Sequence, residues 1–270
     1  MIRPAVVKFA LAAVLLTGGV GAGVNLAGSS GGADAGEPPL RFVLNVPAHR
    51  LYVYENGEPT RTYRVSVGLP GNQTPAGEYA VSSLIWNPWW HPPNSNWARG
   101  RKVESPGPAN PMGRVKLNFA PLLYIHGTVE RSALGDPASR GCVRMSNDDL
   151  IELTRLVHQY LLPSVPESTV ETLVNSPTKT TTFHLPRKIP FEVVYSVVAV
   201  RNGFLYVYPD IYGRVKDYQK QVENVLAAEG IDAGAVDWAR LDELMEKGRT
   251  AKVAISVDEL TRGGRGAGTR

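Results

Sequence analysis

Two residues of this 270-residue chain have the types that cysteine acyl transfer requires: Cys142, its one cysteine, and His126, sixteen positions earlier. A thiolate attacks carbonyl carbons well, but an unperturbed thiol with a pKa near 8.5 is mostly protonated at neutral pH. A histidine beside the thiol can accept its proton, because the imidazole pKa lies close to working pH. The pair therefore predicts a cysteine nucleophile with a histidine base, provided that the fold brings the two together.

Glycines flank both candidate catalytic residues. His126 ends the apolar stretch Leu122-Leu-Tyr-Ile, which is typical of a buried strand, and Gly127 is expected to let the chain turn sharply. Gly141 leaves room for a substrate carbonyl, so the amides of Gly141 and Cys142 are candidate donors to an oxyanion. A lone cysteine is more often a small, inert core residue. The neighbouring glycines favour the catalytic interpretation here.

Two polar residues near the cysteine have alternative roles. Ser139 could orient the cysteine loop or bind substrate, and stabilisation of a local turn explains it equally well. Arg144 could hold a substrate carboxylate with its planar guanidinium. An ion pair with Asp148 or Asp149 that fixes the loop is the slightly favoured interpretation of Arg144.

The segments His126-Gly127-Thr128 and Ser139-x-Gly-Cys-Val-Arg-Met145 together resemble the L,D-transpeptidase catalytic domain, a family of bacterial cell-wall cysteine enzymes. The likeness covers about residues 40 to 175, continues more weakly to about residue 210, and points to the branch that includes lipoprotein-anchoring enzymes. Many members carry a second histidine where this chain has Arg140, so no proton transfer is assigned to Arg140. Arg140 and Thr128 are expected to contact substrate. The upstream motifs are Leu51-Tyr-Val-Tyr54, Gly68, Thr74-Pro75-x-Gly77, Asn87-Pro-x-Trp90 and Gly107-Pro-x-Asn-Pro-Met-Gly113.

The resemblance implies a reaction on peptidoglycan stem peptides, without a metal or cofactor. Cys142 would take the acyl group of a tetrapeptide stem at the L-centre of its third, diamino residue, with release of terminal D-Ala. The acceptor would be another stem's side-chain amine, the lysine of a wall-anchored lipoprotein, or water. Water would make the protein a carboxypeptidase or endopeptidase. A non-catalytic peptidoglycan-binding module and a different cysteine amidase are the remaining alternatives.

Composition is that of an ordinary globular protein, 43% hydrophobic and 20% charged, with a net charge of +4. The sequence has no dense cluster of basic residues, which argues against nucleic-acid binding, and the mild positive charge suits an anionic cell wall. Residues 1–27 combine Arg3 and Lys8 with a short apolar run and small residues, which predicts a secretory signal peptide or an uncleaved anchor. A periplasmic or cell-envelope protein is expected, touching the membrane only through that segment.

A flexible linker is expected over residues 28–39, followed by a mainly β catalytic domain over residues 40–212. Alternating apolar residues predict an antiparallel sandwich or barrel, with hairpin turns at Asn56-Gly57 and Asn202-Gly203. Further strands are expected over the ranges 79–84, 169–174 and 191–200.

One helix is expected after the cysteine, as support for its loop. Ser146 and Asp149 resemble a capping box, and Leu150, Leu153 and Val157 recur at helical spacing. The C-terminal part is expected to be a helical extension over residues 213–257, with Asp237 capping its second helix, and a disordered basic tail over residues 258–270.

A tryptophan-rich segment, residues 85–111, shows no periodicity and contains four tryptophans and six prolines. Tryptophans are rare in disordered chains, so an ordered loop beside the site is predicted. Trp86 is expected to pack the loop onto the sheet. For Trp90, packing and contact with substrate are equally supported.

Overall fold

The computed structural model describes residues 37–262, which form two units. One unit contains Pro39–Val197 and Pro209–Val215, and the other contains Val198–Tyr208 and the chain from Lys216 onward. The predicted signal segment, nearly all of the predicted linker and residues 263–270 lie outside the described residues. Within residues 37–262, none of the helices has the length and apolar character needed to cross a bilayer.

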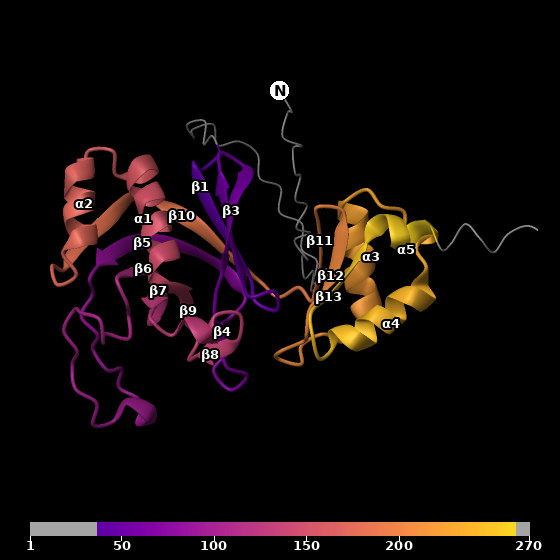
Figure 1. Ribbon diagram of the computed structural model, residues 1–270, viewed down its shortest axis with the longest axis horizontal. Coiled ribbons are helices and arrows are strands. Elements are labelled where there is room, and N and C mark those ends of the chain that lie inside the picture. The colour runs from indigo at the N-terminus through magenta and orange to yellow at the C-terminus, as the bar shows by residue number, and fades with distance from the viewer. Residues whose placement is uncertain (1–36, 263–270) are drawn as a thin grey trace, which may run out of the picture. The chain divides into compact units, whose positions relative to one another are not determined.

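The larger unit is built on an eight-stranded sheet in the order β3-β2-β1-β10-β5-β6-β7-β9 (Figure 1). A short parallel pair, β4 with β8, joins the chain before the tryptophan-rich segment to the chain just before Cys142. The strands are β1 (Leu40–Asn45), β2 (Arg50–Glu55), β3 (Glu58–Arg64), β4 (Val67–Gly68), β5 (Gly77–Trp86), β6 (Val115–Ala120), β7 (Leu123–Thr128), β8 (Pro137–Ser139), β9 (Val143–Ser146) and β10 (Thr181–Val194).

The prediction of a mainly β domain is confirmed, and most strand pairs are antiparallel. The Asn56-Gly57 turn joins β2 to β3 with φ values of 49° and 84°, the left-handed conformation that tight hairpins need. Two pairs of the large sheet, β1–β10 and β7–β9, are parallel. The alternation of apolar residues within one strand does not predict a parallel partner, because parallel strands are joined by long connections and so lie far apart in sequence.

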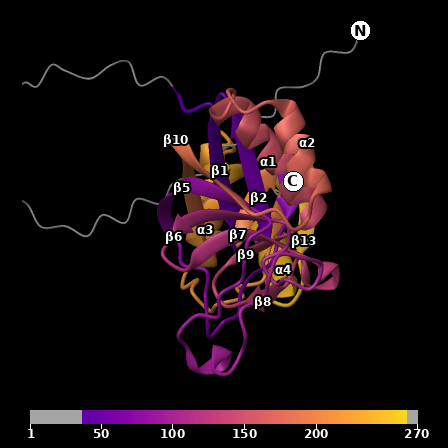
Figure 2. The same ribbon diagram turned by 90° about the vertical axis from the view of Figure 1, so that its left-hand side faces the viewer.

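Helix α1 (Asn147–Leu161) covers one face of the sheet and lies along β6, β7 and β9 (Figures 1 and 2). Its N-cap is Ser146, whose hydroxyl accepts a hydrogen bond from the Asp149 amide at 3.1 Å, as predicted. Leu150, Leu153 and Val157 are buried against the sheet. The apolar side chains of β6, β7 and β9 therefore face α1, and the alternate side chains of these strands face the other way.

The strand predicted over residues 169–174 is wrong, because these residues belong to helix α2 (Glu167–Asn175). Val170 and Leu173 are its buried positions, and they stand three apart. This spacing is helical, whereas Val170, Thr172 and Val174 also alternate as strand residues would. The 3₁₀ turns η1 (Asn96–Ala98) and η2 (Arg131–Ala133) complete this unit.

The second unit combines a three-stranded sheet with helices. Its elements are β11 (Val198–Arg201), β12 (Phe204–Val207), α3 (Tyr218–Ala228), η3 (Ala233–Ala235), α4 (Trp238–Gly248), β13 (Val253–Ser256) and α5 (Val257–Arg262). Asn202-Gly203 forms the β11–β12 turn, and the Asp237 carboxylate caps α4, both as predicted. The β11–β12 hairpin was expected within the catalytic domain, residues 40–212. In the structure β12 pairs with β13, and the hairpin belongs to the second unit. Residues 258–262, expected in the tail, lie in α5.

His158 on α1 is buried, whereas its polar type predicts partial exposure. Trp86 Nε1 donates to His158 Nε2 at 3.1 Å, and the Phe183 ring meets the imidazole edge-on with centroids 4.9 Å apart. Burial lowers the pKa of His158 to about 4. Trp86 is fully buried, so its predicted packing role is confirmed and its indole ties the tryptophan-rich segment to the core.

The buried histidines predict a loss of stability in mild acid. Burial lowers the pKa of His49, His126 and His158 to about 4 each. The unfolded chain, with histidine pKa values near 6.5, binds more protons between about pH 6.5 and pH 4. The free energy of unfolding therefore falls as the pH drops through this window, by up to about 1.4 kcal/mol per pH unit for each histidine.

Urea denaturation across this pH range measures the effect. His158→Gln keeps an oxygen that can accept the Trp86 hydrogen bond but removes one titrating group, so its slope of unfolding free energy against pH should be smaller. A slope equal to that of the parent protein would contradict the assignment.

Candidate active site

The pairing of β6, β7 and β9 brings the predicted catalytic residues onto one face of the sheet. In the antiparallel pair, Lys116 lies opposite His126 and Asn118 lies opposite Tyr124. In the parallel pair, His126 lies beside Arg144. The residues between them are buried in the core on the α1 side. The opposite, polar face therefore carries Lys116, Asn118, Tyr124, His126 and Arg144.

Cys142 joins this polar face immediately before β9. The register of Ile125 with Val143, carried back one residue, places Cys142 beside Tyr124, whose amide donates a hydrogen bond to the sulfur. The Cys142 Sγ lies 3.6 Å from the carbonyl oxygen of Leu122 in the β6–β7 turn. Cys142 and His126 thus share the polar face, at diagonal positions of neighbouring segments.

His126 is held in its neutral form. Its Nδ1 lies 2.9 Å from the Gly127 carbonyl oxygen, which can only accept, so Nδ1 carries the proton and Nε2 is left as the proton acceptor. Burial lowers the pKa of His126 to about 4, and the charges of Arg144 and Lys116 act in the same direction. A main-chain carbonyl thereby does the orienting that a third side chain performs in many catalytic triads.

Gly127 lies within β7, so the predicted sharp turn after His126 is wrong. The glycine permits close packing instead. A Cβ at this position would stand 2.1 Å from Asn147 Oδ1, an atom that accepts a hydrogen bond from the Arg114 amide at 2.9 Å. Asn147, the first residue of α1, thus fixes the end of β7 and the chain entering β6.

Ser139 and Gly141 shape the loop that carries the cysteine. The Ser139 hydroxyl donates to the Cys142 carbonyl oxygen at 2.5 Å and accepts from the Gly141 amide at 3.2 Å. Gly141 has a φ of 107°, a conformation that disfavours other residues. The loop-stabilising interpretation of Ser139 fits these contacts. Because the Gly141 amide already donates to Ser139, the amide of Cys142 is the better candidate oxyanion donor.

Arg144 forms an ion pair with Glu130, at 3.2 Å, and not with either aspartate at the start of α1. Asp148 pairs with Arg131 instead. The Thr128 hydroxyl accepts a hydrogen bond from the Glu130 amide at 3.1 Å, so Thr128 helps to place the partner of Arg144. These contacts match the ion-pair interpretation of Arg144, with a different partner.

Two cations favour the ionised thiol. Burial raises the pKa of Cys142, whereas the Tyr124 amide and the charges of Arg144 and Lys116 oppose that rise. The resting site therefore holds a protonated thiol and a neutral imidazole at neutral pH.

Lys116 was not among the predicted site residues. Its Nζ lies 4.5 Å from the centroid of the Tyr124 ring. Pairing the segment around Lys116 with the one around His126 as a hairpin would have placed the two residues opposite each other.

The tryptophan-rich segment meets the cysteine loop through Trp97, and Trp90 packs within the segment. Trp90 is buried, and its main chain bridges to that of Glu104. Its ring centroid lies 6.5 Å from that of Trp97. The guanidinium of Arg140 stands over the Trp97 ring at 4.6 Å. Arg140 therefore connects the cysteine loop to this segment by a cation–π contact.

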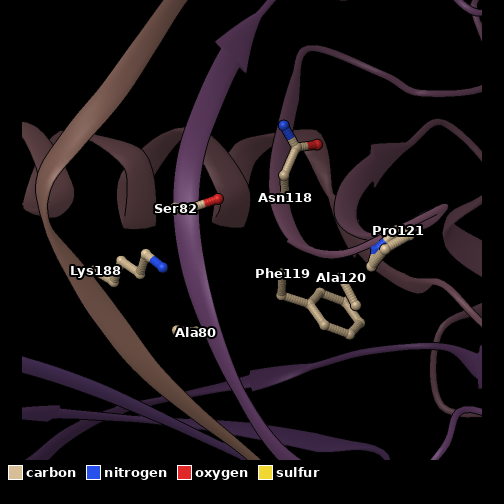
Figure 3. A pocket seen from close by; sticks show the side chains of 7 residues that line it. All are labelled: Ala80, Ser82, Asn118, Phe119, Ala120, Pro121 and Lys188. Atoms are coloured by element: carbon tan, nitrogen blue, oxygen red, sulfur yellow. The ribbon is translucent and has the colours of Figure 1, made fainter.

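The polar face continues into an open depression of about 470 Å³ near the far end of β6. Asn118 lines it from the polar face (Figure 3), and Lys188 enters from the irregular stretch of β10. The lining residues are Ala80, Ser82, Asn118, Phe119, Ala120, Pro121 and Lys188. Pro121 lines the depression, and the carbonyl oxygen of the next residue, Leu122, lies against the Cys142 sulfur. The depression and Cys142 are therefore both next to the β6–β7 turn.

We predict that Lys116 favours the thiolate form of Cys142. The rate of alkylation by iodoacetamide measures the thiolate, and it reports on one site because the chain has one cysteine. Lys116→Met removes the charge and should slow alkylation near neutral pH roughly two- to tenfold, the effect of raising the pKa by about 0.3 to 1 unit. The difference should shrink at high pH. Lys188→Met, a matched loss of an exposed lysine, should react like the parent. Equal rates for Lys116→Met and the parent at every pH would contradict the role.

Known proteins resemble this chain over the unit that contains the polar face. Residues 39–184 match the family model described as the L,D-transpeptidase catalytic domain. The chain is 30% identical over 191 residues to the probable L,D-transpeptidase ErfK/SrfK of Escherichia coli K12, covering 60% of this chain and 59% of that protein. It is 31% identical over 120 residues to the putative L,D-transpeptidase YkuD of Bacillus licheniformis, covering 44% and 61%. The chain thus spans about three-fifths of the length of these relatives.

Solved structures give weaker overlap. An L,D-transpeptidase from Mycobacterium tuberculosis H37Rv is 18% identical with a TM-score of 0.36, covering 58% of each chain. The catalytic domain of the E. faecium L,D-transpeptidase is 14% identical with a TM-score of 0.37, covering 57% of this chain and 96% of that one. The family model, in contrast, matches more than half of this chain and includes both His126 and Cys142. The chain belongs to the L,D-transpeptidase catalytic domain family.

Proposed function

We propose that this protein is an L,D-transpeptidase that works through a thioester on Cys142 and uses His126 as its base. The observation that carries the proposal is the shared sheet face of these two residues, together with the Nδ1 contact that leaves Nε2 of a neutral His126 as the proton acceptor. Family membership supports the reaction class. The electrostatics support the order of events, since a protonated thiol needs a neutral base.

The first half of the reaction forms the thioester. The thiol proton moves to His126 Nε2 while the sulfur attacks the carbonyl carbon at the L-centre of the donor's third residue. The carbonyl oxygen becomes an oxyanion, for which the Cys142 amide is the candidate donor. The carbon–nitrogen bond then breaks, and the leaving amine of D-Ala takes the proton from His126.

The second half transfers the acyl group. An acceptor amine attacks the thioester carbon and gives a proton to His126, a new amide bond forms, and the sulfur leaves as a thiolate that recovers the proton. Stem-to-stem cross-linking is the proposed outcome, because it needs no second protein. A lipoprotein lysine or water would follow the same steps to a different product.

The charge of the site supports an anionic peptide as substrate. Lys116 and Arg144 lie on the polar face, and Lys188 lines the depression beyond the β6–β7 turn. Peptidoglycan stems carry free carboxylates, which such cations attract. The Arg140–Trp97 contact places the tryptophan-rich segment beside the cysteine, where it would limit the access of water to the thioester.

The proposed location is the periplasm or cell envelope, where peptidoglycan is found. It rests on the family and on the composition of residues 1–27. Attachment to the membrane would come only from that segment, if it is retained.

Intact-mass measurement with a purified tetrapeptide stem tests the mechanism. The parent should gain the mass of a tripeptide acyl group and release D-Ala, whereas Cys142→Ala should do neither while keeping its melting temperature. His126→Gln should slow D-Ala release by roughly 10² or more, the usual loss on removing a general base. Release of D-Ala by Cys142→Ala would remove the thioester from the mechanism.

Labelled donor stems mixed with an excess of acceptor stems test the transferase assignment. Aminolysis should exceed hydrolysis, because an amine held near the acyl carbon has a large advantage over bulk water. Mass spectrometry should therefore find more cross-linked dimers than free tripeptides. Accumulation of tripeptide alone would make the protein a hydrolase.

A further inference from the structure

Pro209–Val215 joins the catalytic unit although the elements on both sides of it in sequence belong to the second unit. It follows β12 and precedes α3, and it lies outside the residues that match the family model. Its contacts within this unit include hydrogen bonds to the end of β4 and to the loop between β4 and β5. This loop, residues 68–76, is called here the threonine loop after Thr74.

Tyr212 bridges Gly68 and Thr74, the two ends of the tightest part of the threonine loop. Its hydroxyl donates to the Gly68 carbonyl oxygen at 2.7 Å and accepts from the Thr74 amide at 3.2 Å. The loop is closed tightly, because a Cβ on Gly68 would stand 2.1 Å from the Asn72 carbonyl oxygen. A single phenol oxygen thus fixes the loop where it starts and where it ends.

Thr74 links the threonine loop to the cysteine loop, residues 139–142. Its buried hydroxyl accepts from the Gly68 amide at 2.8 Å and donates to the Gly141 carbonyl oxygen at 3.0 Å. The Leu69 amide donates to the Ser139 carbonyl oxygen at 2.9 Å. The threonine loop therefore holds the cysteine loop at Ser139 and at Gly141.

The hydrogen bond to the Gly141 carbonyl also orients the amide of Cys142. The Gly141 carbonyl and the Cys142 amide are the two halves of one planar peptide group, in which C=O and N–H point in opposite directions. Fixing the carbonyl oxygen on the Thr74 hydroxyl therefore fixes the direction of the Cys142 N–H, the candidate oxyanion donor.

Tyr212 is itself held firmly. Its ring stacks on Tyr195 with centroids 5.4 Å apart, and its amide donates to the Tyr195 hydroxyl at 2.8 Å. That hydroxyl donates to Asp210, whose carboxylate also accepts from the amides of Arg214 and Val215 at 3.0 Å and 2.8 Å. Tyr195 directly follows β10, so the segment is anchored to the end of a central strand.

We propose that Tyr212 is a positioning residue for the oxyanion donor of Cys142, acting through Thr74 and the Gly141–Cys142 peptide group. The inference rests on the proposed function, because it assumes that an oxyanion forms at Cys142. It assigns a task to a segment beyond the family match: Pro209–Val215 completes the support of the nucleophile's backbone.

The test compares two reactions of the same thiol that need no stem peptide. p-Nitrophenyl acetate acylates a thiol through an oxyanion, whereas iodoacetamide alkylates it without one. Tyr212→Phe, which keeps the ring on Tyr195, should slow acylation roughly tenfold, less than the loss of a whole oxyanion donor, and leave alkylation within about twofold of the parent. Thr74→Val should behave alike, and combining the two substitutions should add little, because both break the same chain of contacts.

Tyr54→Phe is the matched control, a buried tyrosine of the same unit that faces Arg41 rather than the cysteine loop. It should change neither rate. Equal slowing of both reactions in Tyr212→Phe, or no slowing of acylation, would overturn the inference. A parent that is acylated by the ester but does not process stems would overturn the proposed substrate and leave the Tyr212 comparison intact.

Discussion

The parallel pairing of β7 with β9 is the interaction on which the catalytic site depends. It puts His126 beside Arg144 and carries Cys142 onto the same face, one strand away from His126. Parallel neighbours cannot be joined by a tight turn, so residues 129–142 must cross over between them. That crossover contains β8 and the cysteine loop, and the short pairing of β8 with β4 holds it in place. The nucleophile thus lies at the end of a connection that is fixed from both sides.

Sequence reasoning reached the parts of this arrangement that local chemistry determines. The structure confirms the start of α1, predicted from its serine cap, and the hairpins, predicted from their Asn-Gly pairs, because each feature depends on a few adjacent residues. The roles of Cys142 and His126, which rest on residue type and resemblance, stay predictions. Lys116, Trp97 and Tyr212 were missed as site residues because their roles depend on pairings between distant segments. The strand wrongly predicted over residues 169–174 also depends on distant contacts. Its sequence fits both a strand and a helix, and packing against the rest of the unit selects the helix.

Burial and charge act against each other in the site. Burial keeps the thiol protonated and His126 neutral, while Lys116 and Arg144 favour the thiolate, the form that the proposed attack requires. In the proposed mechanism these cations gain importance as the proton leaves the sulfur, because they attract a new negative charge that burial leaves poorly solvated. The same cations disfavour a protonated His126, so the imidazolium of the proposed mechanism would need the thiolate or oxyanion to compensate its charge.

The protonated resting thiol also bears on chemical durability. Peroxides oxidise thiolates much faster than thiols, and the first product, a sulfenic acid, is usually rescued by a second cysteine that closes a disulfide. This chain has one cysteine and therefore no internal rescue. A raised pKa at Cys142 therefore gives some protection, because it lowers the fraction of oxidisable thiolate in the resting protein.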